Sequence, residues 1–269
     1  MKKIILVLII FLVPITTRAN LVFEFLWGYN LNLPATMTEY GLGSPIIYNP
    51  QWESRSFTVV EDSPYWAARN GIWNSTHKWG IELEWIHQKI FLINTNSHIQ
   101  HFDISHGYNL FLLNYANKFY ANKGIELIAR VGFGMVIAHA ESIIDGVYNG
   151  TGGKSFTVAG VGGQLALQMR IPIADYLIGF LELKYTAGYA KVPYSGKINP
   201  SGLIEPSILY TGEFHVPHHA IHFTWGFGVD FYHMFNYKRD YSETAKRAWG
   251  TSIRSIQAMQ QKRAENNIN

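Results

Sequence analysis

The sequence predicts an all-β fold, namely an eight-stranded antiparallel transmembrane β-barrel followed by a short C-terminal α-helical tail. Three observations predict this fold. The chain opens on an export signal, apolar and polar residues then alternate with a period of two, and short connections alternate with long ones. Only 15% of the 269 residues are charged, whereas 48% are hydrophobic. Soluble domains carry about 25% charged residues, so the low charge is what a lipid-facing wall requires.

The first nineteen residues have the pattern of a secretory signal peptide. Lys2 and Lys3 precede an apolar run over 4–15, and Thr17-Arg18-Ala19 offers small residues before a cut after Ala19. A run of about twelve residues is too short to span a membrane, which takes roughly twenty. We therefore expect a cleaved signal peptide over 1–19. Removing its three cations leaves 19 basic residues against 19 acidic ones.

Composition excludes several functional classes. The chain has no cysteine, which excludes disulfides, thiolate zinc sites and a cysteine nucleophile. A net charge of +3 over this length provides no basic stripe, so we expect no nucleic-acid partner. No stretch after the signal approaches eighteen uninterrupted apolar residues, so we expect no transmembrane helix.

The rest of the chain alternates with a period of two. In 21–31 every odd position is apolar or aromatic, whereas the even positions include Glu24, Gly28 and Asn30. The eight predicted strands are 21–31, 64–73, 79–85, 103–116, 125–137, 161–171, 181–189 and 219–231. Most have ten to seventeen residues, and a membrane strand needs about nine to eleven.

The connections between these strands alternate in length. Asn74–His77, Asn117–Lys123 and Pro172–Asp175 are expected to be short turns. The stretches near 34–62, 92–101, 140–154 and 193–216 are expected to be long loops. Short turns on one side and long loops on the other are typical of bacterial outer-membrane barrels, with the long loops outside the cell.

The apolar face is predicted to point outward. The polar face is rich in glycine, which a narrow eight-strand lumen needs and a solvated surface does not. The apolar face is almost free of charge, as lipid demands, because a mid-depth Lys or Arg costs roughly 2–4 kcal/mol. Aromatic residues such as Trp79, Tyr176, Tyr29 and Tyr189 stand near strand ends, as in membrane-interface girdles.

The closing segment Gly226-Phe227-Gly228-Val229-Asp230-Phe231-Tyr232-His233-Met234-Phe235 resembles the last strand of outer-membrane proteins. Residues 20–235 as a whole resemble the small eight-stranded outer-membrane barrels, the group of the OmpA transmembrane domain, OmpX, PagP and PagL. The resemblance implies location in the outer membrane of a Gram-negative-type bacterium, contact with lipid and lipopolysaccharide, and recognition of the last strand by the barrel-assembly machinery. The chain departs from most of the group by 34 further residues.

The predicted lumen carries acids and bases in near balance. The expected lumen network consists of Glu24, Arg69, Glu82, Glu84, Arg130, Gln168, Arg170, Glu182, Lys184 and Asp230. An eight-strand barrel is filled by its own side chains, and buried charges must be paired. We expect a salt-bridge network that plugs the lumen. An ion or solute path is the alternative.

Histidines concentrate on the loop side, and three interpretations stay open. We expect His87, His106 and His139 to lie at one outer rim. Imidazoles bind Zn, Cu or Ni, so the candidate metal ligands are His87, His106, His139, His218 and His222. Histidine also suits a wet membrane rim as an amphipathic side chain. No cofactor is implied otherwise.

The third interpretation is a lipid A hydrolase or acyl-modifying enzyme. The resemblance to PagL implies a His and a Ser two residues apart on one strand, with a Glu. The candidates are His106, Ser105, Glu141 and His222, but the chain lacks His-x-Ser. Adjacent residues of a strand also face opposite ways, which places Ser105 and His106 poorly.

The last segment, 236–269, is predicted to be a basic amphipathic helix in the periplasm. Its apolar residues recur at helical spacing, and it holds seven basic and three acidic residues. It suits an anionic membrane surface or a periplasmic partner. The sequence thus predicts a structural or surface-interaction barrel over 20–235. A lipid-modifying enzyme and a soluble secreted ligand-binding barrel are the alternatives.

Overall fold

The computed structural model describes residues 20–41, 43–54, 65–74, 76–122, 124–150, 156–174, 176–198 and 208–231. The side chains of Ser105, His106 and Ile198 are outside this description. The predicted signal peptide and the predicted helical tail also lie outside the described residues. Within the described ranges, no helix is long and apolar enough to cross a membrane.

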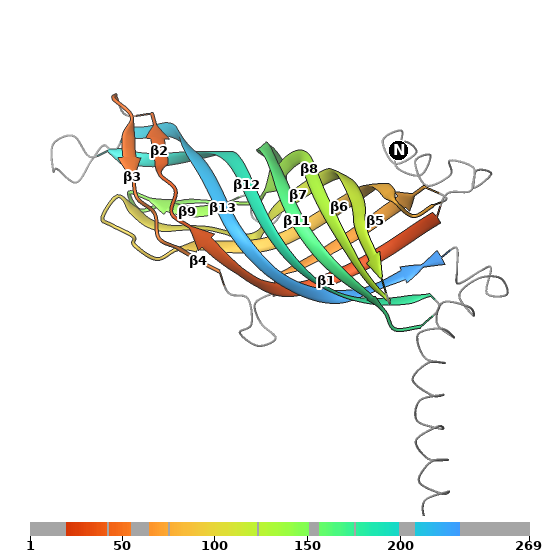
Figure 1. The fold of residues 1–269 in the computed structure, drawn as a ribbon. Coiled ribbons are helices and arrows are strands. Elements are labelled where there is room, and N and C mark those ends of the chain that lie inside the picture. Colours follow the sequence, from red (N-terminus) through yellow and green to blue (C-terminus); the bar gives the residue numbers. More distant parts are fainter. Residues whose placement is uncertain are drawn as a thin grey trace, which may run out of the picture.

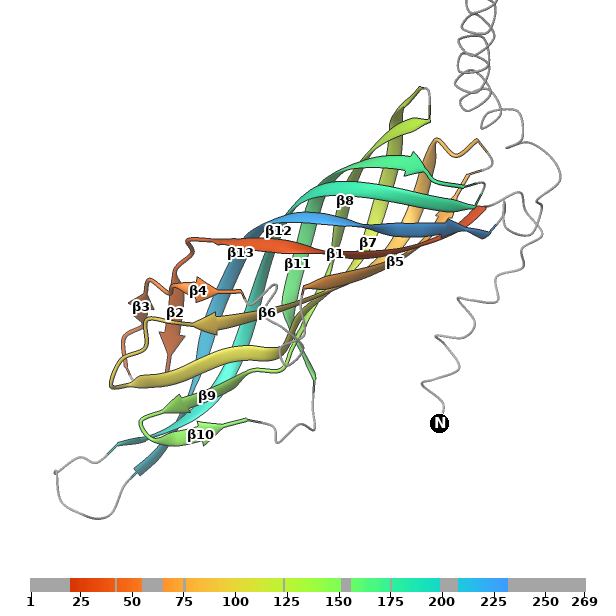
Figure 2. The same cartoon turned by 90° about the horizontal axis from the view of Figure 1, so that it is seen from below.

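Eight antiparallel strands close into a ring (Figures 1 and 2). They are β1 (Asn20–Leu33), β5 (Trp66–Trp73), β6 (Trp79–Leu92), β7 (Ile99–Asn122), β8 (Ile125–Ala138), β11 (Thr157–Pro172), β12 (Leu177–Ile198) and β13 (Ile208–Asp230). The order around the ring is β7-β8-β11-β12-β13-β1-β5-β6, and β6 pairs with β7 to close it. Each strand overlaps one of the eight predicted stretches.

Five short strands extend the sheet at one end of the ring. They are β2 (Met37–Tyr40), β3 (Ile46–Tyr48), β4 (Trp52–Glu53), β9 (Glu141–Ile144) and β10 (Val147–Asn149). β2 pairs with β13, β4 with β6, and β9 with β7. We call this end the loop end. The opposite end, where β5 leads to β6, β7 to β8 and β11 to β12, is called the turn end.

Two expectations about connections are wrong. Much of the stretches expected as long loops is strand, because alternation continues there: Val192 and Tyr194 face inward on β12, opposite Phe214 and Gly212 on β13. The expected turn from Asn117 is strand as far as Asn122, which pairs with Ile125. The polar residues of that stretch concealed the strand.

Alternation decides which side chains enter the ring. Along β13 from Phe214 to Asp230, the even-numbered residues are buried, and Phe223, Trp225 and Phe227 of the odd face are exposed. The predicted assignment of the polar face to the interior therefore agrees with the structure. The interior has three levels. A small apolar group of Val22, Trp73, Ala116 and Ile128 lies at the turn end, a charged layer follows, and a larger apolar core fills the loop end.

Glycine allows the strands to approach closely where the ring curves. A Cβ on Gly134 of β8 would lie 1.9 Å from the carbonyl oxygen of Phe111 on β7. No Cβ tolerates that distance, so a larger residue would force the two strands apart.

Replacing Gly134 by Ala should therefore lower the free energy of unfolding by about 1–3 kcal/mol. A denaturant titration of the refolded protein in detergent measures it. The matched control is Ala129→Val, which adds methyl groups to an exposed position of the same strand. Equal stability of Gly134→Ala and the parent would contradict the expected clash.

Candidate functional site

The charged layer is the most highly connected group of polar side chains inside the ring. It contains four carboxylates and four cations, all buried: Glu24, Glu82, Glu84, Glu182, Arg69, Arg130, Arg170 and Lys184. Their strands place them at one level, since Glu24 pairs in register with Arg69, and Arg69 with Glu84. Period-two alternation on six different strands therefore delivers eight charges to one cross-section.

Arg69 of β5 lies at the centre of this layer. Its Nε and Nη2 donate to both oxygens of Glu84, each at 3.0 Å. Its Nη1 donates to Glu24 at 2.5 Å, and Nη2 also reaches Glu182 at 2.9 Å. The planar guanidinium thus joins three strands, and bidentate pairs of this kind are among the strongest in proteins.

Arg130 and Arg170 extend the layer across the interior. Arg130 donates to both oxygens of Glu82, at 2.6 and 3.2 Å, and to Glu182 at 3.1 Å. Arg170 donates to Glu24 at 2.5 Å and lies 4.8 Å from the ring centroid of Trp73. The charged layer is therefore in contact with the apolar group at the turn end.

Lys184 closes the layer from the other side. It donates to Glu84, and its Nζ lies 3.1 Å from Glu182. β12, which carries Lys184, and β6, which carries Glu84, are diametrically opposite in the eight-strand order. An ion pair therefore crosses the full width of the ring. Amide side chains complete the layer: Gln164 donates to Glu84 and Asn114, and Gln168 donates to Glu24.

Asp230, predicted to be in the lumen network, lies apart from these charges. It is near the turn end, with Oδ2 3.9 Å from Nδ1 of His77. Sequence analysis did not include Asn114 in the network, although it donates to Glu84 at 2.8 Å. Asn114 lies on the polar face of β7, and this position in the alternating pattern could have identified it as a lumen residue.

His218 and His222 lie on the inner face of β13, above the charged layer. His218 Nε2 is 2.9 Å from Oδ1 of Asn32, and Nδ1 is 3.3 Å from Nε2 of Gln88. His222 Nε2 is 2.8 Å from the hydroxyl of Thr186. All of these histidine contacts are with neutral groups inside the ring, and both imidazoles are buried. They are interior residues and not part of an accessible rim.

The remaining rim candidates have separate surroundings. His87 bonds Asn109 at 2.9 Å and stacks on Trp66, whereas His139 lies 3.6 Å from Glu141 and 5.7 Å from the ring of Phe156. Among the described residues no group of three or more His, Asp or Glu is arranged to hold a metal ion. The side chains of Ser105 and His106, the candidate nucleophile and base, lie outside the described residues.

A second polar cluster lies at the loop end and was missed by sequence analysis. His98 Nε2 is 2.8 Å from Glu39, and Nδ1 is 3.0 Å from Asp145. Burial lowers the pKa of His98, but the two carboxylates outweigh burial and raise it above its ordinary value. These residues come from three segments far apart in the chain, and no local pattern joins them.

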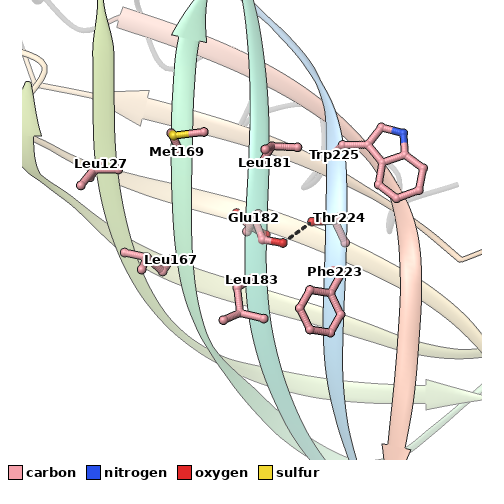
Figure 3. A pocket seen from close by; sticks show the side chains of 9 residues that line it. All are labelled: Leu127, Leu167, Met169, Leu181, Glu182, Leu183, Phe223, Thr224 and Trp225. Atoms are coloured by element: carbon pink, nitrogen blue, oxygen red, sulfur yellow. Dashed lines mark hydrogen bonds between the residues drawn. The ribbon is translucent and has the colours of Figure 1, made fainter.

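The outer wall of the ring is apolar. The outward residues at 21–31, 66–72, 79–87, 111–119, 125–137, 161–171, 179–189 and 219–229 include no Asp, Glu, Lys or Arg. We call these positions the apolar belt. A shallow hollow in it is lined by Leu127, Leu167, Met169, Leu181, Glu182, Leu183, Phe223, Thr224 and Trp225 (Figure 3). At its floor Thr224 donates to the backbone carbonyl of Glu182 at 3.3 Å.

Aromatic rings lie side by side on the outer wall. The ring of Trp85 lies 4.7 Å from that of Trp66 and 5.2 Å from that of Phe111. Trp27 lies 5.2 Å from Phe227. Such neighbouring rings form a continuous band across several strands.

Comparisons with known proteins give structural similarity alone. No family model matches the sequence, and no curated protein matches it. Among solved structures, the chain is similar to Neisserial surface protein A (NspA), with a TM-score of 0.33, 8% identity, and coverage of 79% of this chain and 97% of that one. It is also similar to the outer-membrane protein OprG of Pseudomonas aeruginosa, with a TM-score of 0.39, 11% identity, and coverage of 79% and 93%.

Replacing Lys184 by Met should destabilise the ring strongly, because four buried carboxylates would then face three cations. Breaking one partner of a buried ion pair costs about 3–5 kcal/mol. A denaturant titration measures the change. The double variant Lys184→Met with Glu84→Gln restores the balance and should recover most of the loss. If Lys184→Met unfolds at the same denaturant concentration as the parent, Lys184 does not contribute to the stability of the charged layer.

Proposed function

We propose that the chain is an integral outer-membrane protein of a Gram-negative-type bacterium, an eight-stranded barrel with a side-chain-filled lumen and a structural or surface-interaction role. The observation that carries this proposal is a belt without charged residues around a ring whose interior is crossed by ion pairs. A pore needs an open path, and an enzyme needs accessible reacting groups. The charged layer provides a rigid and neutral plug.

The apolar belt supports insertion in lipid. Along β1 the belt extends over a span of eleven residues, from Leu21 to Leu31. This span is about the length of a tilted membrane strand. Leu165 and Phe133, in the middle of their strands, are 59% and 66% exposed. Lipid chains would fill the hollow of Figure 3 without any polar partner. The aromatic band then lies where the lipid meets the outer medium.

The alternative of a soluble secreted barrel requires the same belt to face water. A soluble monomer rarely exposes a contiguous apolar patch of more than about 300–600 Å². The belt encircles all eight strands. We therefore favour lipid as its surroundings.

The interior supports a closed barrel. Lys184 and Glu84 bridge opposite strands, and Arg69 and Arg130 occupy the space between them. Above them the apolar core, which includes Ile86 and Leu110, fills the loop end. Eight-stranded barrels leave room for side chains and little else.

The proposal includes three expectations about partners. Lipopolysaccharide would contact the belt and the loop end. The assembly machinery would recognise the last strand, whose outward face carries Phe223, Trp225 and Phe227. The tail over 236–269, outside the described residues, would contact the membrane surface or a periplasmic partner.

A charge in the belt tests insertion. Phe133→Arg should cost about 2–4 kcal/mol in lipid and reduce the fraction of protein recovered in outer membranes. The matched control is Ile47→Arg on β3, because Ile47 is equally exposed at 68% but lies outside the belt. Fractionation followed by detergent extraction measures both. Recovery of the unmodified mature protein in the soluble fraction would refute the membrane proposal.

Electrical recording tests the closed lumen. In planar lipid bilayers the refolded protein should give no stepwise conductance at neutral pH, because ion pairs block the cross-section. An open outer-membrane porin, recorded in the same bilayers, is the positive control. Stable and regular conductance steps from the purified protein would contradict a plugged interior.

A further inference from the structure

The loop end is held together by side chains from several elements that have no extensive pairing with one another. β2 is four residues long and β10 three, and β2 pairs with β13 over only three positions. Such short ladders are weak by themselves. The cluster around His98 connects them, so its chemistry governs how firmly the loop end is closed.

His98 lies in the connection between β6 and β7 and contacts an acid on each side. Glu39 comes from β2, and Asp145 from the turn between β9 and β10. That turn is Asp145-Gly146, with φ of 47° and 74°, the geometry of a tight two-residue hairpin. The amide of Asp145 also donates to the carbonyl of His98 at 3.0 Å. The two hairpins therefore meet at one imidazole.

Three tyrosines also donate hydrogen bonds to the two acids. Tyr48 of β3 donates to Oε2 of Glu39 at 2.5 Å, and Tyr194 of β12 donates to Oε1. Tyr210 of β13 donates to Oδ2 of Asp145 at 2.7 Å. Tyrosine hydroxyls donate most readily to ionised carboxylates, so this arrangement favours charged acids. Both ring nitrogens of His98 then act as donors, which requires the imidazolium form.

We propose that Glu39, His98 and Asp145 form a pH-dependent latch that fastens the β2–β3 and β9–β10 hairpins over the apolar core of the loop end. With His98 protonated, the imidazolium bridges both hairpins. With His98 neutral, one ring nitrogen carries no proton, so one of the two acids loses the hydrogen bond from His98 and keeps its charge beside a half-buried ring. The latch then opens more often, and it exposes core residues such as Met37 and Phe102.

The direction of the pH effect follows from linkage. A histidine with a pKa raised on folding stabilises the closed state fully below its unfolded value of about 6.5. The stabilisation is lost as the pH rises through the raised value. The latch is therefore firm in mildly acidic medium and weaker in mildly alkaline medium. Each unit by which the pKa is raised corresponds to a tenfold change in the opening equilibrium.

Other titratable groups lie close to the same hairpins. His215 of β13 bonds Glu213 at 2.6 Å and lies under Tyr40 of β2, with 4.4 Å between the rings. The other pairs nearby are His101 with Asp103, His139 with Glu141, and Lys191 with Glu213. The ring of His215 contacts Tyr40 of β2 directly, so His215 provides the matched control.

Hydrogen exchange of the refolded full-length protein in detergent tests the latch. Peptides that contain β2 and β9 are followed by mass spectrometry at about pH 6 and pH 8.5, with rates corrected for intrinsic exchange. The opening equilibrium of both should rise severalfold at the higher pH. A peptide from β8, within the belt, should not change. The inference concerns the loop end alone and stands or falls independently of membrane insertion.

Two variants identify the residue responsible. His98→Gln should exchange rapidly at both pH values, because glutamine cannot bridge two acids with a positive charge. His215→Gln should keep the pH dependence of the parent. The proposal is overturned if corrected exchange in the parent is the same at both pH values, or if His98→Gln keeps the full pH effect. Loss of the pH dependence in His215→Gln would also overturn it.

Discussion

The interaction on which the whole structure depends is the ion network around Arg69. A ring of eight strands encloses a narrow interior, and six of its strands each turn a charged residue into the same level. Every one of these charges would be very unfavourable alone, because burial removes it from water. Four carboxylates facing four cations cancel, and each cation contacts at least two partners. The ring is therefore closed twice, once by backbone pairing and once by ion pairs across its interior.

This constraint accounts for other features of the wall. Long side chains that meet at the centre leave no room for bulky neighbours at the same height, which is where Gly132 stands. A Cβ on Gly132 would clash with the side-chain oxygen of Asn114, a member of the layer. The apolar belt is the counterpart on the outside. Since the charged residues of the strands within the belt are directed inward, the outer face there is left to residues that suit lipid.

Much of the fold could be predicted from the sequence, because the alternation of apolar and polar residues indicates on which face of a strand each residue lies. It placed Glu82, Arg130 and Lys184 on the polar face before any strand order was known. It did not state which cation contacts which acid, since partners such as Arg170 and Glu24 lie as much as 146 residues apart. Partner choice depends on the closure of the ring, and closure is a property of the whole chain.

The loop end was harder to predict for a different physical reason. Glu39, His98 and Asp145 stand in turns and short strands with no repeated pattern, and only the folded hairpins bring them together. The expectation of a histidine-rich rim was correct in composition but not in grouping: His218 and His222 are interior residues with neutral partners. A histidine acquires its role from its surroundings, which single-sequence patterns do not describe.

The two polar clusters also differ in the way they respond to their surroundings. In the charged layer the cations are three arginines and one lysine. Guanidinium groups stay protonated at any physiological pH, so that layer stays balanced through the range in which bacteria live. The loop-end cluster has a histidine in the corresponding place, the one side chain whose ordinary titration falls in that range. Mild changes of pH therefore act on the cover of the ring and leave its closure intact. A ring built in this way keeps a permanently balanced charged layer inside the belt and confines any adjustable part to the loop end.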